Sequence, residues 1–352
     1  MTILMLLILG APFYSDKANL MEVRSESGEN RAVVNEEDWK IRRGHILENM
    51  QAVMGEVVDP AQVDFDVVYE ESIRFEKFTR HKITFQVEAG DRLPAYLLIP
   101  HDVEEAVPGV LCLHPTNKDG KGMVVGMVDR PNRNYAEELA ARGYVTLAPD
   151  YPGFGEYMID VYGMGYESAT AKGILNHRRC VDLLASLEEV DEERIGAIGH
   201  SLGGHNALYL AAFEPRVKAV VTSCGFNSFA KYKGGDLTGW SHKGYMPRIA
   251  EVYGKDPARM PFDFTEVLGV IAPRPLFISA PLHDANFEVS GVRDCVRAAE
   301  PVYELLGSPG NLRVVYPDCA HDFPPEIREQ AYLFLDESLD GVDVSASVKR
   351  DN

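Results

Sequence analysis

The sequence is short of basic residues, and this shortage excludes one large class of partners. It has 35 lysines and arginines against 54 aspartates and glutamates, a formal net charge of −19 at pH 7. Nucleic-acid binding needs clustered Lys and Arg that meet the phosphates, so we expect no nucleic-acid partner. The surplus of acidic residues is interpreted as a feature that favours solubility.

Cysteine is also scarce. The five cysteines are scattered, odd in number and without any C-x-x-C pair. A disulfide framework or a zinc site would show an even number or short recurring spacings, so the sequence predicts neither, and we expect no metal and no cofactor. Cys112 and Cys224 lie in apolar, strand-like runs and are expected to be buried as small hydrophobic residues.

The sequence lacks an apolar run long enough to cross a bilayer. The run at residues 3–9 is too short for this, and it has neither the basic flank nor the small-residue cleavage site of a secretory signal. An atypical signal and a segment packed on the domain both stay open. The compartment is therefore undetermined, and no stable membrane insertion is expected.

Apolar strand-like runs alternate with helical patterns from residue 81 onward. This alternation predicts an α/β protein with an eight-stranded, mostly parallel sheet that helices cover on both faces. The first two strands form a hairpin. The predicted strands are residues 81–87, 93–99, 109–114, 144–148, 194–200, 217–222, 275–279 and 312–316. The predicted helices are residues 36–54, 134–142, 170–187, 204–213, 289–306 and 325–339.

Three parts of the chain follow from this pattern. Residues 1–80 form an N-terminal extension that contains one amphipathic helix, with a mostly polar, irregular stretch before it. Residues 81–339 form the catalytic domain, which carries a lid-like insertion at residues 225–264. Residues 340–352 are polar and are expected to be a flexible tail.

A serine stands at the centre of a glycine-flanked motif between a strand-like and a helix-like run. Ser201 is the middle residue of Gly-His-Ser-Leu-Gly at residues 199–203. Flanking glycines let neighbouring backbone pass close to a strained strand-to-helix turn. The helix after the turn directs its N–H groups and its positive dipole end at the serine oxygen. The spacing predicts a nucleophilic serine and hence a serine hydrolase.

Eight strands, an opening hairpin and a serine after the fifth strand resemble the α/β-hydrolase fold. This resemblance covers residues 81–339 and implies the chain order Ser, then Asp or Glu, then His. Asp284, in the loop after the seventh strand, is implied as the acid, and His321, in the loop after the eighth, as the base. Asp236 occupies an alternative acid position that some members of the superfamily use. Asp284 is favoured because its loop is short and directly follows a buried strand.

The same resemblance implies where the oxyanion of the tetrahedral intermediate would be held. One donor is the backbone N–H of Leu202, immediately after the nucleophile. The other comes from the loop after the third strand, where His114-Pro115 stands in place of the common His-Gly. Because Pro115 has no N–H, the backbone of Thr116 is the candidate, with Asn117 as a substitute. The His114 side chain is expected to brace this loop.

Three long segments, residues 117–133, 151–165 and 225–264, are expected to overhang the serine, since loops at the carboxyl ends of the strands shape the pocket in this fold. The third segment is rich in aromatic residues that we expect to be exposed among Gly and polar residues. They suit stacking on a sugar ring or an aryl ester, and each also suits simple packing of a lid. Trp240 is the candidate for substrate contact.

The Asp-Tyr-Pro-Gly-Phe-Gly motif at residues 150–155, the serine motif and the N-terminal helix resemble the dienelactone hydrolase and acetyl xylan esterase branch of bacterial hydrolases. Dienelactone hydrolases proper use a cysteine nucleophile, so Ser201 argues against that reaction. The resemblance implies a metal-independent serine carboxylic ester hydrolase that acts through an acyl-enzyme on acyl esters of carbohydrates or on small esters. Two alternatives stay open: a prolyl-oligopeptidase-like peptidase, and an inactive binding protein on a hydrolase scaffold. The oligomeric state is undetermined.

Overall fold

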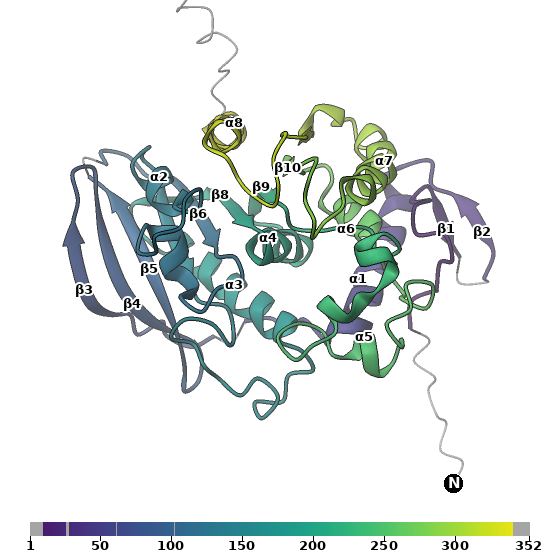
Figure 1. Ribbon diagram of the computed structural model, residues 1–352, viewed down its shortest axis with the longest axis horizontal. Coiled ribbons are helices and arrows are strands. Elements are labelled where there is room, and N and C mark those ends of the chain that lie inside the picture. The colour runs from purple at the N-terminus through teal and green to yellow at the C-terminus, as the bar shows by residue number, and fades with distance from the viewer. Residues whose placement is uncertain (1–9, 26–27, 61, 102, 341–352) are drawn as a thin grey trace, which may run out of the picture.

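A nine-stranded, mostly parallel sheet organises the molecule (Figure 1). The structure is a computed structural model and describes residues 10–25, 28–60, 62–101 and 103–340. The strand order is β11-β10-β9-β8-β6-β7-β5-β4-β3. Strands β6 to β11 run parallel to one another, whereas β5 pairs antiparallel with β7, and β3, β4 and β5 form an antiparallel end. The strands are β3 (Val68–Arg74), β4 (Phe78–Glu88), β5 (Asp91–Pro100), β6 (Val107–Leu113), β7 (Val145–Pro149), β8 (Val190–His200), β9 (Val217–Ser223), β10 (Leu276–Ser279) and β11 (Leu312–Val315).

The eight strands predicted from the sequence are present, and the predicted fold class is confirmed. The ninth strand, β3, was missed because every residue in it is exposed. With neither face buried, the strand needs no alternation of apolar and polar residues, and its sequence therefore carries no strand pattern. It pairs antiparallel with β4 at the edge of the sheet and lies inside the range predicted as an extension.

Helices cover both faces of the sheet, and a separate apolar cluster lies between each face and the helices that cover it. One cluster draws side chains from α1, α3, α4, α6 and α7, and the other from α2 and α8. Strand β6 serves both, because Leu111 and Leu113 belong to the first cluster and Val110 and Cys112 to the second. The helices are α1 (Glu36–Met54), α2 (Tyr135–Ala140), α3 (Ala169–Ala185), α4 (Leu202–Phe213), α5 (Arg248–Glu251), α6 (Phe264–Ile271), α7 (Val289–Leu305) and α8 (Pro325–Leu335).

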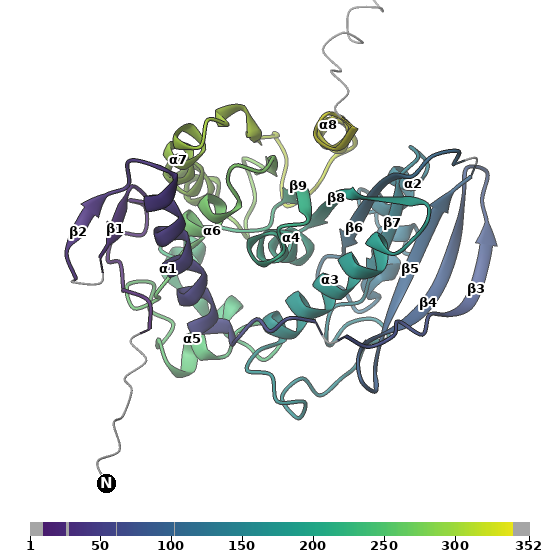
Figure 2. The same cartoon turned by 180° about the vertical axis from the view of Figure 1, so that it is seen from behind.

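The N-terminal part packs against the insertion and the following helices. Helix α1 starts at Asn35, whose side chain caps it by accepting a hydrogen bond from the Asp38 N–H, and it lies alongside α5 and α6 (Figure 2). A fully buried ion pair between Arg42 and Glu266 joins α1 to α6. The stretch before α1 differs from the irregular structure we predicted, because β1 (Glu22–Arg24) and β2 (Asn30–Ala32) form a small antiparallel sheet there.

Two predictions from the sequence fall outside the described residues: the apolar run at residues 3–9 and the tail at residues 341–352. In the described part of the chain, no helix is both long enough and apolar enough to cross a membrane.

A buried carboxylate organises the loop after β7. Asp150 is fully buried and accepts hydrogen bonds from the backbone N–H of Lys121 at 2.8 Å, the Lys121 ammonium at 2.7 Å and the backbone N–H of Glu156 at 2.9 Å. A Cβ atom at Gly120 or at Gly155 would lie 2.1 Å from Asp150 Oδ1. Gly155 of the Asp-Tyr-Pro-Gly-Phe-Gly motif and Gly120 are therefore needed for the backbone to approach this carboxylate closely.

Candidate active site

Ser201 occupies a tight turn between β8 and α4. Its backbone has φ 55° and ψ −119°, a conformation that residues other than glycine rarely adopt. A Cβ at Gly199 would lie 2.2 Å from the Gly203 carbonyl group, and one at Gly203 would lie 1.9 Å from the Leu113 oxygen. Only glycine fits at either position, so the sequence spacing reflects the crowding of three backbone segments around a strained serine.

Asp284 and His321, distant in sequence, are hydrogen-bonded to each other. His321 Nδ1 lies 2.8 Å from Asp284 Oδ2, and the Asp284 side chain is fully buried. Oδ1 of Asp284 accepts from the backbone N–H groups of Asn286 at 2.7 Å and Phe287 at 3.0 Å. Burial alone would raise the pKa of Asp284, but the His321 contact and these backbone hydrogen bonds outweigh it and hold the pKa below its ordinary value. Asp284 is therefore a carboxylate, and His321 Nδ1 must carry the proton that it donates.

The alternative acid, Asp236, has a different task. Its side chain is solvent-exposed and accepts a hydrogen bond from the Thr238 N–H at 2.9 Å, at the start of a short 3₁₀ helix. Of the two acids considered from the sequence, Asp284 is the one in contact with His321.

A second histidine, His200, precedes Ser201 in the chain and lies next to His321, whereas no hydrogen bond joins Ser201 to His321 among the described residues. The ring of His200 is 4.9 Å from that of His321, which puts the Asp284–His321 pair beside the turn that carries Ser201. His200 is buried, stacks on Phe323 and lies 3.1 Å from the Ser223 hydroxyl through Nδ1. Burial lowers the pKa of His200 well below its ordinary value, so this ring stays neutral and adds no positive charge next to His321.

The two candidate oxyanion donors belong to segments that touch. The close approach of Gly203 to Leu113 packs the first turn of α4 against the end of β6, from which the chain continues to Thr116. Leu202 is the first residue of α4, where backbone N–H groups have no partner within the helix. His114 braces the loop as expected: it bonds the Pro115 carbonyl at 2.8 Å, and its Nε2 accepts from the Tyr151 N–H at 2.9 Å.

An arc of aromatic side chains joins His321 to Thr116. Consecutive ring centroids are 5.8 Å apart from His321 to Phe287, from Phe287 to Trp240 and from Trp240 to Tyr245. The arc ends where the Tyr245 hydroxyl lies 3.2 Å from the Thr116 hydroxyl. These residues are far apart in the sequence, and the arc connects the candidate base to the loop that carries the second candidate oxyanion donor.

Most aromatic residues of the insertion are buried, so of the two alternatives open from the sequence, simple packing of a lid describes them better than exposure for stacking. Trp240 is only 4% exposed, and Phe226, Phe229 and Tyr232 are buried as well. Their rings pack on one another and on α6. These aromatic side chains therefore belong to the core and not to the surface. The indole N–H of Trp240 is itself buried and has no hydrogen-bond partner among the described residues.

Cys224 is a neighbour of the acid and the base that sequence analysis did not associate with the site. It follows β9 with a φ of 50° and is buried as expected. Its Sγ, a carboxylate oxygen of Asp284 and a ring nitrogen of His321 all lie within 4.8 Å of one another. In the described part of the chain, this is the group of side chains that could hold a metal ion.

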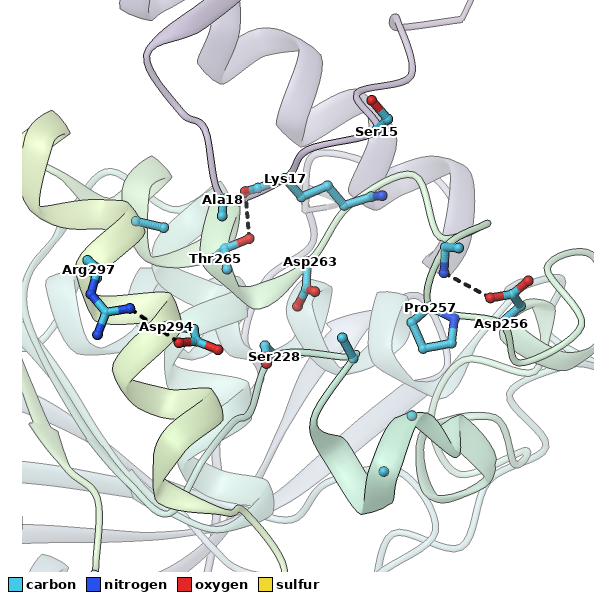
Figure 3. Close-up of a pocket in the computed structure, with 15 residues that line it drawn as sticks. Ser15, Lys17, Ala18, Ser228, Asp256, Pro257, Asp263, Thr265, Asp294 and Arg297 are labelled. Carbon is cyan, nitrogen blue, oxygen red and sulfur yellow. Dashed lines mark hydrogen bonds and ion pairs between the residues drawn. The ribbon is translucent and has the colours of Figure 1, made fainter.

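A separate cavity of about 740 Å³ lies between the N-terminal segment, the insertion and α6 and α7 (Figure 3). Lys17 reaches across it, and the Asp263 carboxylate points into it from the start of α6. None of the three candidate catalytic residues lines it. Burial raises the pKa of Asp263 to about 7, against hydrogen bonds from the backbone N–H groups of Phe229 and Phe264 that favour the carboxylate.

Two family models match the chain. The model for fungal glucuronyl esterases covers residues 157–307, and the FrsA-like esterase model covers residues 53–230, just over half of the chain. The chain belongs to the FrsA-like esterase family. Both matched ranges of this esterase contain Ser201, and the first also contains Asp284.

Individual relatives also match more than half of the chain. YtaP of Bacillus subtilis is 27% identical over 271 residues, which cover 73% of this esterase and 87% of YtaP. The 4-O-methyl-glucuronoyl methylesterase of Phanerochaete carnosa is 25% identical over 224 residues, which cover 57% of this chain and 53% of that one.

Solved structures share the fold over nearly the whole molecule. The glucuronoyl esterase of Solibacter usitatus is 19% identical with a TM-score of 0.72, over 93% of this chain and 99% of that one. Acetyl xylan esterase 1 of Thermoanaerobacterium sp. is 20% identical with a TM-score of 0.55, over 82% of this chain and 97% of that one. The comparisons confirm the predicted α/β-hydrolase fold, the esterase class and the likeness to acetyl xylan esterases.

Proposed function

We propose that this esterase is a serine carboxylic ester hydrolase in which Ser201 is the nucleophile, His321 the general base and Asp284 the orienting acid. The hydrogen bond between His321 Nδ1 and the Asp284 carboxylate carries the proposal. It fixes the proton on Nδ1 and leaves the lone pair of Nε2 free to accept the hydroxyl proton of the serine.

The reaction follows from these roles. Ser201 attacks the ester carbonyl as its proton passes to His321 Nε2, and the oxygen that becomes negative is held by the N–H groups of Leu202 and Thr116, with the dipole of α4 behind them. His321 then gives the proton to the leaving alcohol, and an acyl-enzyme remains. Water loses a proton to His321, attacks the acyl group and releases the acid.

We further propose carbohydrate-borne esters as the substrate class. The support is the agreement of a matching glucuronyl esterase family model with relatives and structures whose names specify glucuronoyl and acetyl xylan esterases. These names describe two bond types, an ester of a uronic acid with an alcohol and an acetyl ester of a sugar hydroxyl. Trp240, in the aromatic arc, is the proposed substrate contact, through an indole N–H that is buried here and has no hydrogen-bond partner among the described residues.

The test compares the wild type with Ser201→Ala on three substrates: an alkyl ester of glucuronic acid, acetylated xylo-oligosaccharide and an aryl acetate. We expect the wild type to prefer one carbohydrate ester in kcat/KM, and Ser201→Ala to lose about 10⁴-fold or more in kcat on all three. Ser241→Ala, a serine of the insertion, serves as the control. Full activity of Ser201→Ala on the aryl acetate would contradict the mechanism, and a higher kcat/KM of the wild type on the aryl acetate than on either carbohydrate ester would contradict the substrate class.

A further inference from the structure

The thiol of Cys224 reaches the Asp284–His321 pair without having a task in ester hydrolysis. The backbone N–H of Cys224 bonds the Ser279 carbonyl at the end of β10, at 3.0 Å, and its Sγ lies 3.5 Å from the Asp322 carbonyl. Together with the positive φ, these contacts hold the side chain at the edge of the sheet where the acid and base loops leave it. The result is a thiol, a carboxylate and an imidazole whose donor atoms lie within 4.8 Å of one another.

This donor set matches one class of ion. Sulfur and imidazole nitrogen are ligands of Zn²⁺ and of softer ions, whereas Mg²⁺ and Ca²⁺ require oxygen donors. In a tetrahedral zinc site with bonds of about 2.0–2.3 Å, ligand atoms are about 3.3–3.7 Å apart. The three donors here are thus within about 1 Å of coordination distance, which small rotations of the side chains can supply.

The charges also favour a divalent ion. A thiolate and a carboxylate bring two negative charges, and a neutral imidazole brings none. A divalent cation therefore gives a neutral site, which matters because Cys224 and the Asp284 side chain are buried and a net charge there would be costly to desolvate.

We propose that Cys224, Asp284 and His321 form an inhibitory site for a thiophilic divalent cation such as Zn²⁺ or Cd²⁺. Binding replaces the Cys224 thiol proton, which goes to solvent, and takes the lone pair of His321 Nδ1. The imidazole keeps one proton, now on Nε2. No oxidation or reduction takes place.

Inhibition follows from the change of tautomer. With the proton on Nε2, His321 offers a donor to Ser201 where the reaction needs an acceptor. This consequence rests on the proposed function, whereas metal binding itself depends on the three side chains alone. The two claims can therefore fail separately.

The experiment measures binding and inhibition in the same set of proteins. In a chelator-free buffer we expect micromolar Zn²⁺ to lower the aryl acetate activity of the wild type at least tenfold, with recovery after EDTA and no effect of Mg²⁺. Cd²⁺ is expected to produce the ultraviolet thiolate-to-cadmium charge-transfer band, which is measured without any substrate. Zn²⁺ should also slow the labelling of Ser201 by a fluorophosphonate.

Cys224→Ala tests the assignment, with Cys224→Ser as a second variant in case the first does not fold. Either is expected to keep the activity within about threefold, to lose the cadmium band and to need at least ten times more Zn²⁺ for half inhibition. Cys319→Ala removes the thiol two residues from His321 and should behave as the wild type. His283→Ala breaks the exposed His283–Asp318 pair, whose imidazole and carboxylate lie 2.7 Å apart and offer a second pair of ligands for a cation, and it should also leave inhibition unchanged.

Three results would overturn the proposal: no inhibition of the wild type, equal inhibition of Cys224→Ala, or loss of inhibition in His283→Ala. The two claims can be separated by their outcomes. A cadmium band that depends on Cys224 supports the metal site, and full activity of the Ser201→Ala variant contradicts the proposed catalytic mechanism.

Discussion

Two buried aspartates follow parallel strands of the same sheet, and they differ in the partner that they hold. Asp150 comes after β7 and Asp284 after β10, and each accepts two backbone N–H groups and one side-chain N–H. The side chain on Asp150 is the ammonium of Lys121, itself 3% exposed. The side chain on Asp284 is the imidazole of His321, which is 28% exposed.

In the proposed mechanism, the difference in partner separates a structural carboxylate from a catalytic one. An ammonium with a buried counter-ion keeps its charge and its geometry, so Asp150 holds the loop after β7 in one arrangement. An imidazole has a second nitrogen that can take up and release a proton near neutral pH, so a carboxylate that fixes its first nitrogen controls the chemistry of the second. The identity of the partner, rather than the burial of the carboxylate, decides the function.

The largest effect is expected for Asp284→Asn. The amide cannot hold the Nδ1–H tautomer of His321, and kcat should fall by about 10³–10⁴-fold with little change in stability. Steady-state kinetics on an aryl acetate measure this. Asp318→Asn, in the base loop, should stay within about threefold of the wild type, and a loss of less than tenfold in Asp284→Asn would remove its assigned role.

Asp150→Asn should show the opposite pattern. It leaves the buried ammonium of Lys121 with only the half-exposed Glu156 carboxylate, and we expect the free energy of unfolding to fall by roughly 3 kcal/mol. The folded fraction should keep kcat within about tenfold. Urea unfolding measures the loss of stability, and activity at urea concentrations below the unfolding transition measures kcat. The control Glu156→Gln should lower the free energy of unfolding by less than about 1 kcal/mol. An Asp150→Asn variant that is stable but inactive would break the comparison.

Gly155→Ala tests how closely the backbone must approach Asp150. Gly153 and Gly155 both have a positive φ, at 84° and 58°, but a Cβ at Gly153 meets nothing within 4 Å. Alanine should therefore cost about 1 kcal/mol at Gly153 through backbone strain and about 2–3 kcal/mol at Gly155 through strain plus displacement of the carboxylate. Equal urea midpoints for the two variants would contradict this close contact.

The smallest effect concerns Asp263, a third aspartate, which lacks a cationic partner at bonding distance among the described residues. Its pKa near 7 lies above the unfolded value, so the folded state binds the proton more tightly, and stability falls as the pH rises from about 4 to 7. Asp263→Asn keeps a good helix cap and cannot ionise. Relative to this variant, the wild type should lose about 1–1.5 kcal/mol between pH 6 and pH 8 in urea unfolding, and a constant difference would contradict the raised pKa.

Sequence patterns predicted the parts of the molecule that local rules control. The strand-turn-helix around Ser201 and the alternation of strands and helices were sufficient for the fold, and the chain order pointed to Asp284 and His321. What the patterns missed depends on tertiary packing. Trp240 is buried because aromatic rings from distant parts of the chain pack together. The thiol of Cys224 reaches its neighbours because Cys224 has a positive φ, which a cysteine in a sequence does not predict.

Stoichiometric labelling with a fluorophosphonate, followed by peptide mass mapping, tests the central claim most directly, because the reagent is captured by an activated serine. We predict one adduct per chain, on Ser201, with strongly slowed labelling in His321→Ala and none in Ser201→Ala. Ester hydrolysis that continues in an unlabelled protein, or an adduct on another residue, would contradict the account.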